Sequence, residues 1–173
     1  MMKSMLIVAL AAAPAIFAQQ AQTEAQILKG AYNGIKNNLT KAAEKMPEEQ
    51  YSFKASPDIR TFGELIAHVA DVQARICSAA AGSEAPASPA GKTAKADLVA
   101  ALAKSYEVCD GVFNSLTDAD ASKTMSMGRG GARSEFGTLW QFIIAHSNEE
   151  YGYLAVYMRL KGIVPPSSEG RGR

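Results

Sequence analysis

The sequence is short of the features that mark several functional classes. Its 18 lysines and arginines barely outnumber its 17 aspartates and glutamates, and a net charge of +1 gives no basic surface for nucleic acid. Histidine and cysteine occur only twice each, and the cysteines do not form a Cys-x-x-Cys motif. We therefore expect no nucleic-acid partner and no site built on closely spaced cysteines.

The first 18 residues have the pattern of a secretory signal peptide. Lys3 supplies a positive charge, Met5–Ala13 is apolar but too short to cross a bilayer, and Pro14 interrupts it. We expect cleavage after Ala18, which leaves Gln19 as the new terminus; the alternative is a retained helical anchor. No later segment is apolar enough to span a membrane, and the leader has no lipobox cysteine. The sequence predicts a bacterial periplasmic or secreted protein with no membrane contact after cleavage.

The rest of the chain predicts one all-α domain. The sequence is 47% hydrophobic and 20% charged, which suits a protein with a real core. Apolar residues recur at helical spacing in four segments, 23–46, 61–81, 94–116 and 135–161. Four amphipathic helices indicate a four-helix bundle over residues 19–166, followed by a flexible polar tail at 167–173.

Capping and turn residues place the ends of the second helix most clearly. Thr61 and Glu64 form a Thr-x-x-Glu capping box at its start, and Gly82 follows its last alanine. The linkers before and after this helix are each about a dozen residues long, enough to cross a bundle, so parallel neighbours are allowed. The stretch 117–134 is irregular, and the sequence does not place a hairpin or turn within it.

The two histidines and one glutamate form the candidate site. His146 and Glu150 are four residues apart, on one face of the last helix, and His68 lies beside the apolar stripe of the second. Two imidazoles and a carboxylate that meet between helices could hold a divalent metal, with open positions for water or a small-molecule ligand. The donor set fits zinc, nickel, iron or manganese. The alternative is two hydrogen-bonded histidines and a surface glutamate.

Two carboxylates on the second helix are candidates to support the site. Glu64 and Asp71 lie at i−4 and i+3 from His68, where either could accept an imidazole N–H. Solvated helix charge is the commoner role for such residues, and Glu64 also has its place in the capping box.

Other side chains on or near the last helix are weaker candidates for a functional role. Glu149 lies about 100° round the helix from Glu150, so we expect it to point outward. Tyr153, seven residues beyond His146, is the aromatic residue best placed to reach a pocket. The segment Gly128–Arg133 could bind an anion, but arginine in a glycine loop more often marks a solvated turn.

Two blocks of sequence resemble a known superfamily. The stretch HSNEEYGYLAVYMRLKGIVPP (146–166) looks like the last helix of the DinB-like (DinB/YfiT) superfamily, and SFKASPDIRTFGELIAHVADVQARICSAAAG (52–82) looks like its second helix with the preceding loop. The resemblance implies a bundle of up-down-down-up topology. It also implies a divalent metal on three histidines, one from the second helix and a His-x-x-x-His pair from the fourth. His68 and His146 match two of these positions.

Glu150 stands where the resemblance places the third histidine. A carboxylate ligand occurs in a similar branch, the mycothiol-dependent isomerases, but the change could equally mark a lost site. The resemblance leaves three functions open: an exported metal-binding protein, a metal-dependent thiol S-transferase, or a bundle with a decayed site that serves interaction. It also implies that helices pair between subunits, and hence a homodimer.

The cysteines are interpreted through the same topology. If the second and third helices run parallel, as the resemblance implies, Cys77 and Cys109 lie at similar heights and can form a disulfide, as export permits. The alternative is two buried free thiols. Cys77 follows His68 by nine residues, half a turn out of phase, so we do not expect it to be a metal ligand.

Overall fold

The computed structural model describes residues 21–126 and 131–170, so the expected signal peptide lies outside the described residues. The helices are α1 Glu24–Lys45, α2 Phe62–Ala81, α3 Lys95–Ser115, α4 Glu135–Thr138 and α5 His146–Leu160. Two short strands, β1 Thr124–Ser126 and β2 Ala132–Ser134, pair antiparallel with Met125 opposite Arg133. Among the described residues, no helix has the length and hydrophobicity to cross a bilayer.

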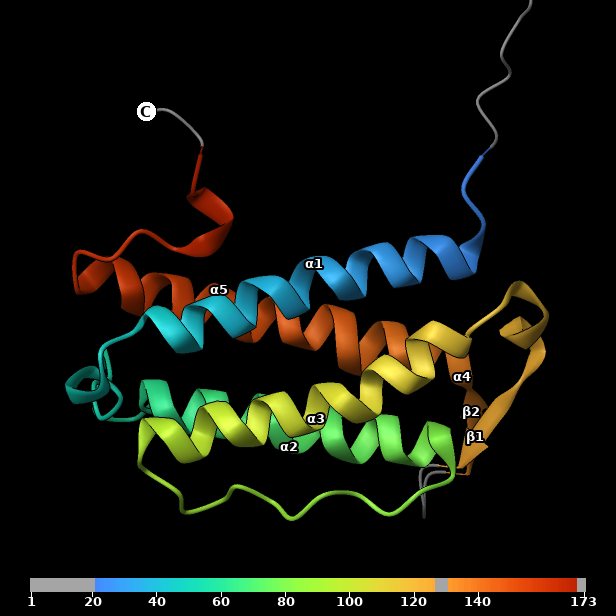
Figure 1. Ribbon diagram of the computed structural model, residues 1–173, viewed down its shortest axis with the longest axis horizontal. Coiled ribbons are helices and arrows are strands. Elements are labelled where there is room, and N and C mark those ends of the chain that lie inside the picture. Colours follow the sequence, from blue (N-terminus) through green and yellow to red (C-terminus); the bar gives the residue numbers. More distant parts are fainter. Residues whose placement is uncertain (1–20, 127–130, 171–173) are drawn as a thin grey trace, which may run out of the picture.

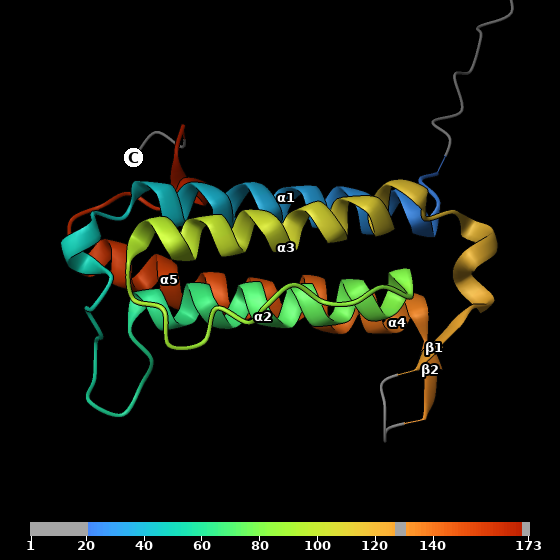
Figure 2. The ribbon, with the colours of Figure 1, turned by 60° about the horizontal axis from the view of Figure 1, so that its bottom comes forward.

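The helices form a bundle of up-down-down-up topology, as the superfamily resemblance implies. Figure 1 shows α1 running in one direction, α2 and α3 running back, and α4 and α5 returning in the direction of α1. The linker between α2 and α3 runs the whole length of the bundle, which makes these two helices parallel neighbours. Figures 1 and 2 together place α1 beside α3 and α5, and α2 beside α3 and α5. The site residues of α2 and α5 therefore lie on adjacent helices.

Local sequence sets where the long helices begin and end. The Thr61 hydroxyl accepts from the Glu64 backbone N–H while the Glu64 carboxylate accepts from the Thr61 N–H, so the predicted capping box is confirmed. Thr23 caps α1 in the same way with Gln26. Gly82 ends α2 in the left-handed conformation, at φ 65°, where glycine carries no steric penalty.

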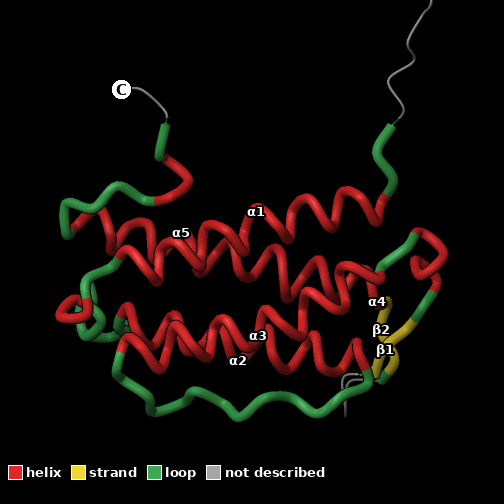
Figure 3. The backbone as a smooth tube through the Cα atoms, viewed as in Figure 1, coloured by secondary structure: helices red, strands yellow, loops and turns green. Residues whose placement is uncertain are grey.

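The last helix is continuous but changes its winding before the site. Between α4 and α5 the residues Leu139–Ala145 form a π-helix, and the backbone N–H of His146 donates to the carbonyl oxygen of Gln141, five residues back. Figure 3 shows α4, this segment and α5 as one uninterrupted helix. A π turn contains about one residue more than an α turn, so the side chains that follow it are rotated by roughly 100° about the helix axis. The sequence pattern predicts this helix but not its π segment.

The core is apolar and aromatic, with one covalent cross-link. Tyr32 of α1 stacks on Phe113 of α3 with ring centroids 4.1 Å apart. A disulfide joins Cys77 of α2 to Cys109 of α3, with Cα atoms 5.0 Å apart and both side chains fully buried. The parallel arrangement of α2 and α3 brings these positions to one height.

The segment expected to be a flexible tail makes definite contacts over its described part. Pro166–Ser168 is a single 3-10 turn, and the Ser167 backbone N–H donates to the Tyr151 hydroxyl at 2.9 Å. Lys45 pairs with Glu169 at 2.6 Å. These bonds fold the chain back over α1 and α5 as far as residue 170.

Candidate metal centre

The three candidate ligands meet at one point between α2 and α5. The Nε2 atoms of His68 and His146 are 3.1 Å apart. Oε1 of Glu150 lies 3.7 Å from Nε2 of His68 and 3.5 Å from Nε2 of His146. Residues separated by 78 positions in the chain thus present three ligand atoms to a common centre, as the sequence predicts.

The position of each ligand along its helix brings its side chain to the site. His68 lies seven residues after Thr61, the N-cap of α2, and so two turns into that helix. His146 is the first residue of α5 after the π segment, and Glu150 follows one turn later on the same face. The π winding therefore decides which face of α5 carries the pair.

The spacing of the three atoms suits a metal ion. A circle through atoms 3.1, 3.5 and 3.7 Å apart has a radius of about 2.0 Å. Metal–nitrogen and metal–oxygen bonds of zinc in proteins are about 2.0–2.2 Å, so one ion can contact all three atoms without a change of rotamer. Three protein ligands leave at least one coordination position open.

Burial sets the protonation of the site. It lowers the pKa of His68 and His146 below the ordinary histidine value, and the positive charge of Arg60 lowers both further. Burial also raises the pKa of the Glu150 carboxyl, against a lowering by Arg60. Neutral imidazoles are the form that binds a metal, and a divalent ion beside Glu150 would favour its carboxylate form.

Two polar atoms of the site have no hydrogen-bond partner among the described residues. These are Oε2 of Glu150, whose residue is only 5% exposed, and Nδ1 of His146. The atoms that face the centre are Oε1 of Glu150 and Nε2 of His146, so a cation there would offset the buried charge of the Glu150 carboxylate without pairing Oε2 or Nδ1. Without a cation, one Nε2 must carry a proton and donate to the other across their 3.1 Å contact. The burial of Glu150 and the spacing of the three ligand atoms therefore fit a divalent metal.

A small polar cluster borders the site, which the sequence pattern does not reveal. The Gln73 amide nitrogen contacts the Tyr106 hydroxyl at 3.4 Å and the Ser147 hydroxyl at 3.3 Å, and Gln73 and Ser147 are fully buried. Ser147 directly follows His146 in the chain. These contacts tie the start of α5 to α2 and α3, and so help to fix the His146 backbone.

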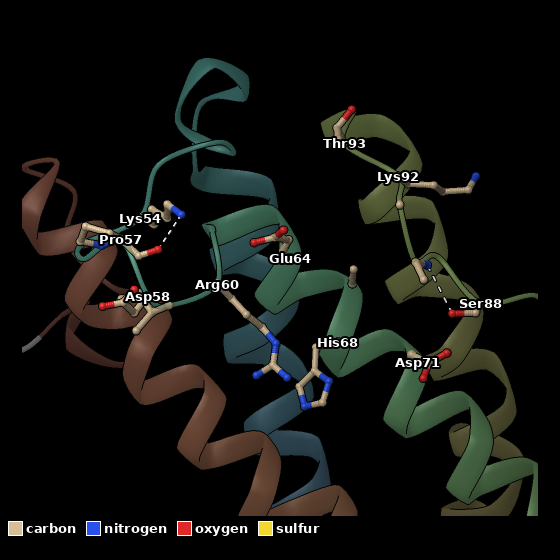
Figure 4. Close-up of a pocket in the computed structure, with 14 residues that line it drawn as sticks. Lys54, Pro57, Asp58, Arg60, Glu64, His68, Asp71, Ser88, Lys92 and Thr93 are labelled. Atoms are coloured by element: carbon tan, nitrogen blue, oxygen red, sulfur yellow. Dashed lines mark hydrogen bonds between the residues drawn. The ribbon is translucent and has the colours of Figure 1, made fainter.

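An open pocket of about 640 Å³ reaches the site from the His68 side. Its walls come from loop 54–60, the first turns of α2 and loop 88–93. Figure 4 shows the Arg60 side chain extending toward α2, with its guanidinium group next to the His68 ring. Sequence analysis did not single out Arg60, and a lone arginine before a helix cap gives no signal that it turns toward a histidine.

The proposed supporting carboxylates do not hydrogen-bond to the imidazoles. The Glu64 carboxylate is occupied by the Thr61 N–H, as its capping role requires. Asp71 lines the pocket and its charge raises the pKa of His68, but among the described residues it makes no hydrogen bond to either histidine. Its influence is that of a nearby charge.

The residues around Glu150 on α5 differ in exposure according to the face of the helix on which they lie. Glu149 is exposed, as predicted. Tyr153 is 48% exposed and its hydroxyl donates to the Glu149 carboxylate, so the prediction that it reaches a pocket is wrong. Tyr153 and Glu149 are four residues apart on α5, so their side chains are neighbours on the exposed surface of that helix. Residues 128–130 of the candidate anion site at Gly128–Arg133 lie outside the described residues.

Fold and site together define a helical-bundle protein with a candidate metal centre between two adjacent helices. Comparison with known families gives the assignment: the DinB superfamily profile matches residues 32–154, and the chain belongs to this superfamily. The matched region contains all three candidate ligands.

Among solved structures, the chain is similar to a DinB-like protein from Bacillus cereus ATCC 10987, at a TM-score of 0.65 and 17% sequence identity. The match covers 80% of this chain and 93% of that protein. At this identity the likeness supports the fold alone. No curated protein matches the sequence.

Proposed function

We propose that this protein is an exported metal-binding member of the DinB superfamily. It holds one divalent ion on His68, His146 and Glu150. The observation that carries the proposal is the triangle of ligand atoms with sides of 3.1, 3.5 and 3.7 Å, which encloses a centre at bonding distance from each.

The donor set favours a borderline cation such as zinc, nickel, iron or manganese. Two neutral imidazoles and one carboxylate leave the bound ion a net positive charge. When bound, such an ion supplies Lewis-acid chemistry and lowers the pKa of a water or thiol on its open position. The chain's own residues hold the ion and restrict access to it, since α5 and the core close one side and the pocket beside His68 opens the other.

Metal content of the purified chain tests the proposal. We expect about one zinc ion per chain after loading and dialysis, measured by mass spectrometry of the metal. His68→Ala and Glu150→Ala should each weaken binding by more than the roughly 10–100-fold that loss of a supporting residue costs. Glu149→Ala is the matched control, because it removes an exposed carboxylate next to Glu150 and should retain full binding. Absence of metal in the wild-type chain, or equal binding by Glu149→Ala and Glu150→Ala, would contradict the proposal.

Glu150→His gives a second, independent reading of the site. It restores the three-histidine set that the superfamily resemblance implies. The imidazole nitrogen reaches about as far from the backbone as the glutamate oxygen, so we expect this variant to bind zinc. If Glu150→Ala binds zinc as tightly as Glu150→His does, position 150 is not a ligand of the metal.

The pocket beside His68 favours a second candidate function, a metal-dependent thiol S-transferase. A small thiol could enter the 640 Å³ space and bind the ion as a thiolate, which would then attack an electrophile. Transfer of glutathione to 1-chloro-2,4-dinitrobenzene by the zinc-loaded protein is the test. Activity lost in His68→Ala would support this function, and no rate above that of the metal-free chain would reject it.

A third candidate, an interaction domain without metal, is favoured by the exposed apolar side chains of the last helix. Trp140, Val156 and Leu160 are 50%, 54% and 59% exposed. Sedimentation analysis distinguishes a homodimer from a monomer. A dimer that binds no metal would support this candidate, and a monomer with one bound ion would reject it.

Export is a separate part of the proposal. It is supported by the signal-like residues 1–18 and by the Cys77–Cys109 disulfide, a bond typical of oxidising compartments. Mass spectrometry of protein from the periplasm of an expressing bacterium should find a chain that begins at Gln19. An intact Met1 in the cytoplasmic fraction would contradict it.

A further inference from the structure

Arg60 is a charged side chain whose placement serves neither the fold nor the metal. Its guanidinium lies next to His68 in the pocket, yet among the described residues it forms no ion pair and no side-chain hydrogen bond. Its positive charge acts on all three candidate ligands. A cation there repels a bound metal ion, so the arrangement favours an anion between the two.

The backbone of Arg60 is held in place by the same helix that carries His146 and Glu150. The Tyr157 hydroxyl of α5 donates to the Arg60 carbonyl oxygen at 2.8 Å. Phe53 packs edge-on against the Tyr157 ring at 5.7 Å, which anchors the beginning of the loop. A residue fixed in this way presents its side chain to the pocket at a low entropic cost.

Three of the other charged residues of the pocket have partners, whereas Asp71, three residues beyond His68, places a negative charge near the site. Lys54 donates to the Pro57 carbonyl oxygen, Lys92 lies 3.9 Å from Asp97, and Glu64 caps α2. Three basic residues and three acidic ones line the pocket: Lys54, Arg60 and Lys92 with Asp58, Glu64 and Asp71. This balance favours a ligand with a single negative charge over a multiply charged one.

We propose that the pocket binds a small molecule with one carboxylate group, and that the Arg60 guanidinium holds that carboxylate beside the metal position. The planar guanidinium matches a carboxylate with two parallel hydrogen bonds. Ile59, Ala67 and Ala90 give the pocket apolar surface for the body of the molecule. The inference rests on the proposed metal site for its location, and it adds the class of ligand.

Benzoate and benzamide form a matched pair of probes, because they share a ring and differ in charge. Binding is followed by two-dimensional NMR of the nitrogen-15-labelled chain, both zinc-loaded and metal-free. We expect benzoate to bind at least about tenfold more tightly than benzamide, to shift the Arg60 Nε–H signal, and to shift signals of loop 88–93. In Arg60→Gln this preference should fall to within about twofold.

Arg75→Gln is the control variant. Arg75 is an exposed arginine of α2, the helix that follows Arg60, and it does not line the pocket. Its loss changes the net charge equally. It should keep the tenfold preference. A preference retained in Arg60→Gln, or no benzoate binding by either form of the wild-type chain, overturns the inference. The metal-free form is also tested, so the two proposals can fail separately. Benzoate binding that depends on Arg60 in a chain that takes up no zinc would reject the metal site alone. Zinc uptake by a chain that shows no Arg60-dependent benzoate binding would reject the carboxylate site alone.

Discussion

Removal of the Cys77–Cys109 disulfide should cost much of the protein's stability and none of its metal binding. The bond closes a loop with a sequence separation of 32 residues, and the loop-entropy relation gives about 3.7 kcal/mol for a loop of this length. Both sulfur atoms are fully buried, so the Cys77→Ala, Cys109→Ala double variant also leaves a small void. We expect the free energy of unfolding to fall by about 3–5 kcal/mol and Tm by about 7–15 °C.

Urea unfolding followed by circular dichroism measures this change. The wild-type chain in strong reductant should approach the double variant, while the double variant should not respond to reductant. The site is distant, because Cys77 lies nine residues beyond His68, or about 13 Å along α2. Zinc stoichiometry should therefore be unchanged. A loss of stability below about 1 kcal/mol would refute the view that the cross-link restricts the unfolded chain.

Three further changes probe packing, the loop and protonation. Gly63→Ala should lower the free energy of unfolding by about 1–3 kcal/mol, because the added Cβ would lie 3.1 Å from Leu98 Cδ1 and 3.2 Å from the Tyr51 carbonyl oxygen. Gly34→Ala, on the open surface of α1, should raise it by about 0.5–1 kcal/mol. Changes of the same sign in the two variants, measured by urea unfolding, would contradict this packing. Tyr157→Phe removes the hydrogen bond to the Arg60 carbonyl oxygen, so it should lower the free energy of unfolding by about 0.5–1.5 kcal/mol while the chain still binds one zinc ion. An unchanged urea midpoint would show that this hydrogen bond does not stabilise the fold. Zinc affinity should be nearly constant above the ordinary histidine pKa of 6.5 and should fall only below that pH. Burial lowers the pKa of both site histidines, so protons compete with zinc only at lower pH. A competition titration that shows a steep loss of affinity between about pH 8 and 7 would contradict this.

Much of the fold follows from local signals in the sequence. Thr61 begins α2 with a capping box and Gly82 ends that helix, as the residue types predict. The helix-compatible spacing of His146 and Glu150 places both on one face, and the long linker after α2 permits the parallel α2–α3 pair. These features depend on contacts a few residues apart, which sequence patterns report well.

Features that depend on distant contacts were not predictable in the same way. The π segment Leu139–Ala145 has ordinary helix-forming residues, so nothing in its pattern marks the wider turn. The strands β1 and β2 are three residues each and are too short for alternation to show. The approach of Arg60 to His68 depends on the path of an irregular loop, which Tyr157 fixes from another helix.

X-ray absorption of the zinc-loaded chain tests the central claim most directly, because it reports the ligands of the bound ion. The account predicts nitrogen and oxygen neighbours at about 2.0–2.1 Å, with the outer-shell scattering of two imidazoles and no sulfur. His68→Ala should lose one imidazole from that signal. A site with fewer than two imidazoles, or with sulfur ligands at about 2.3 Å, would contradict the assignment of His68, His146 and Glu150.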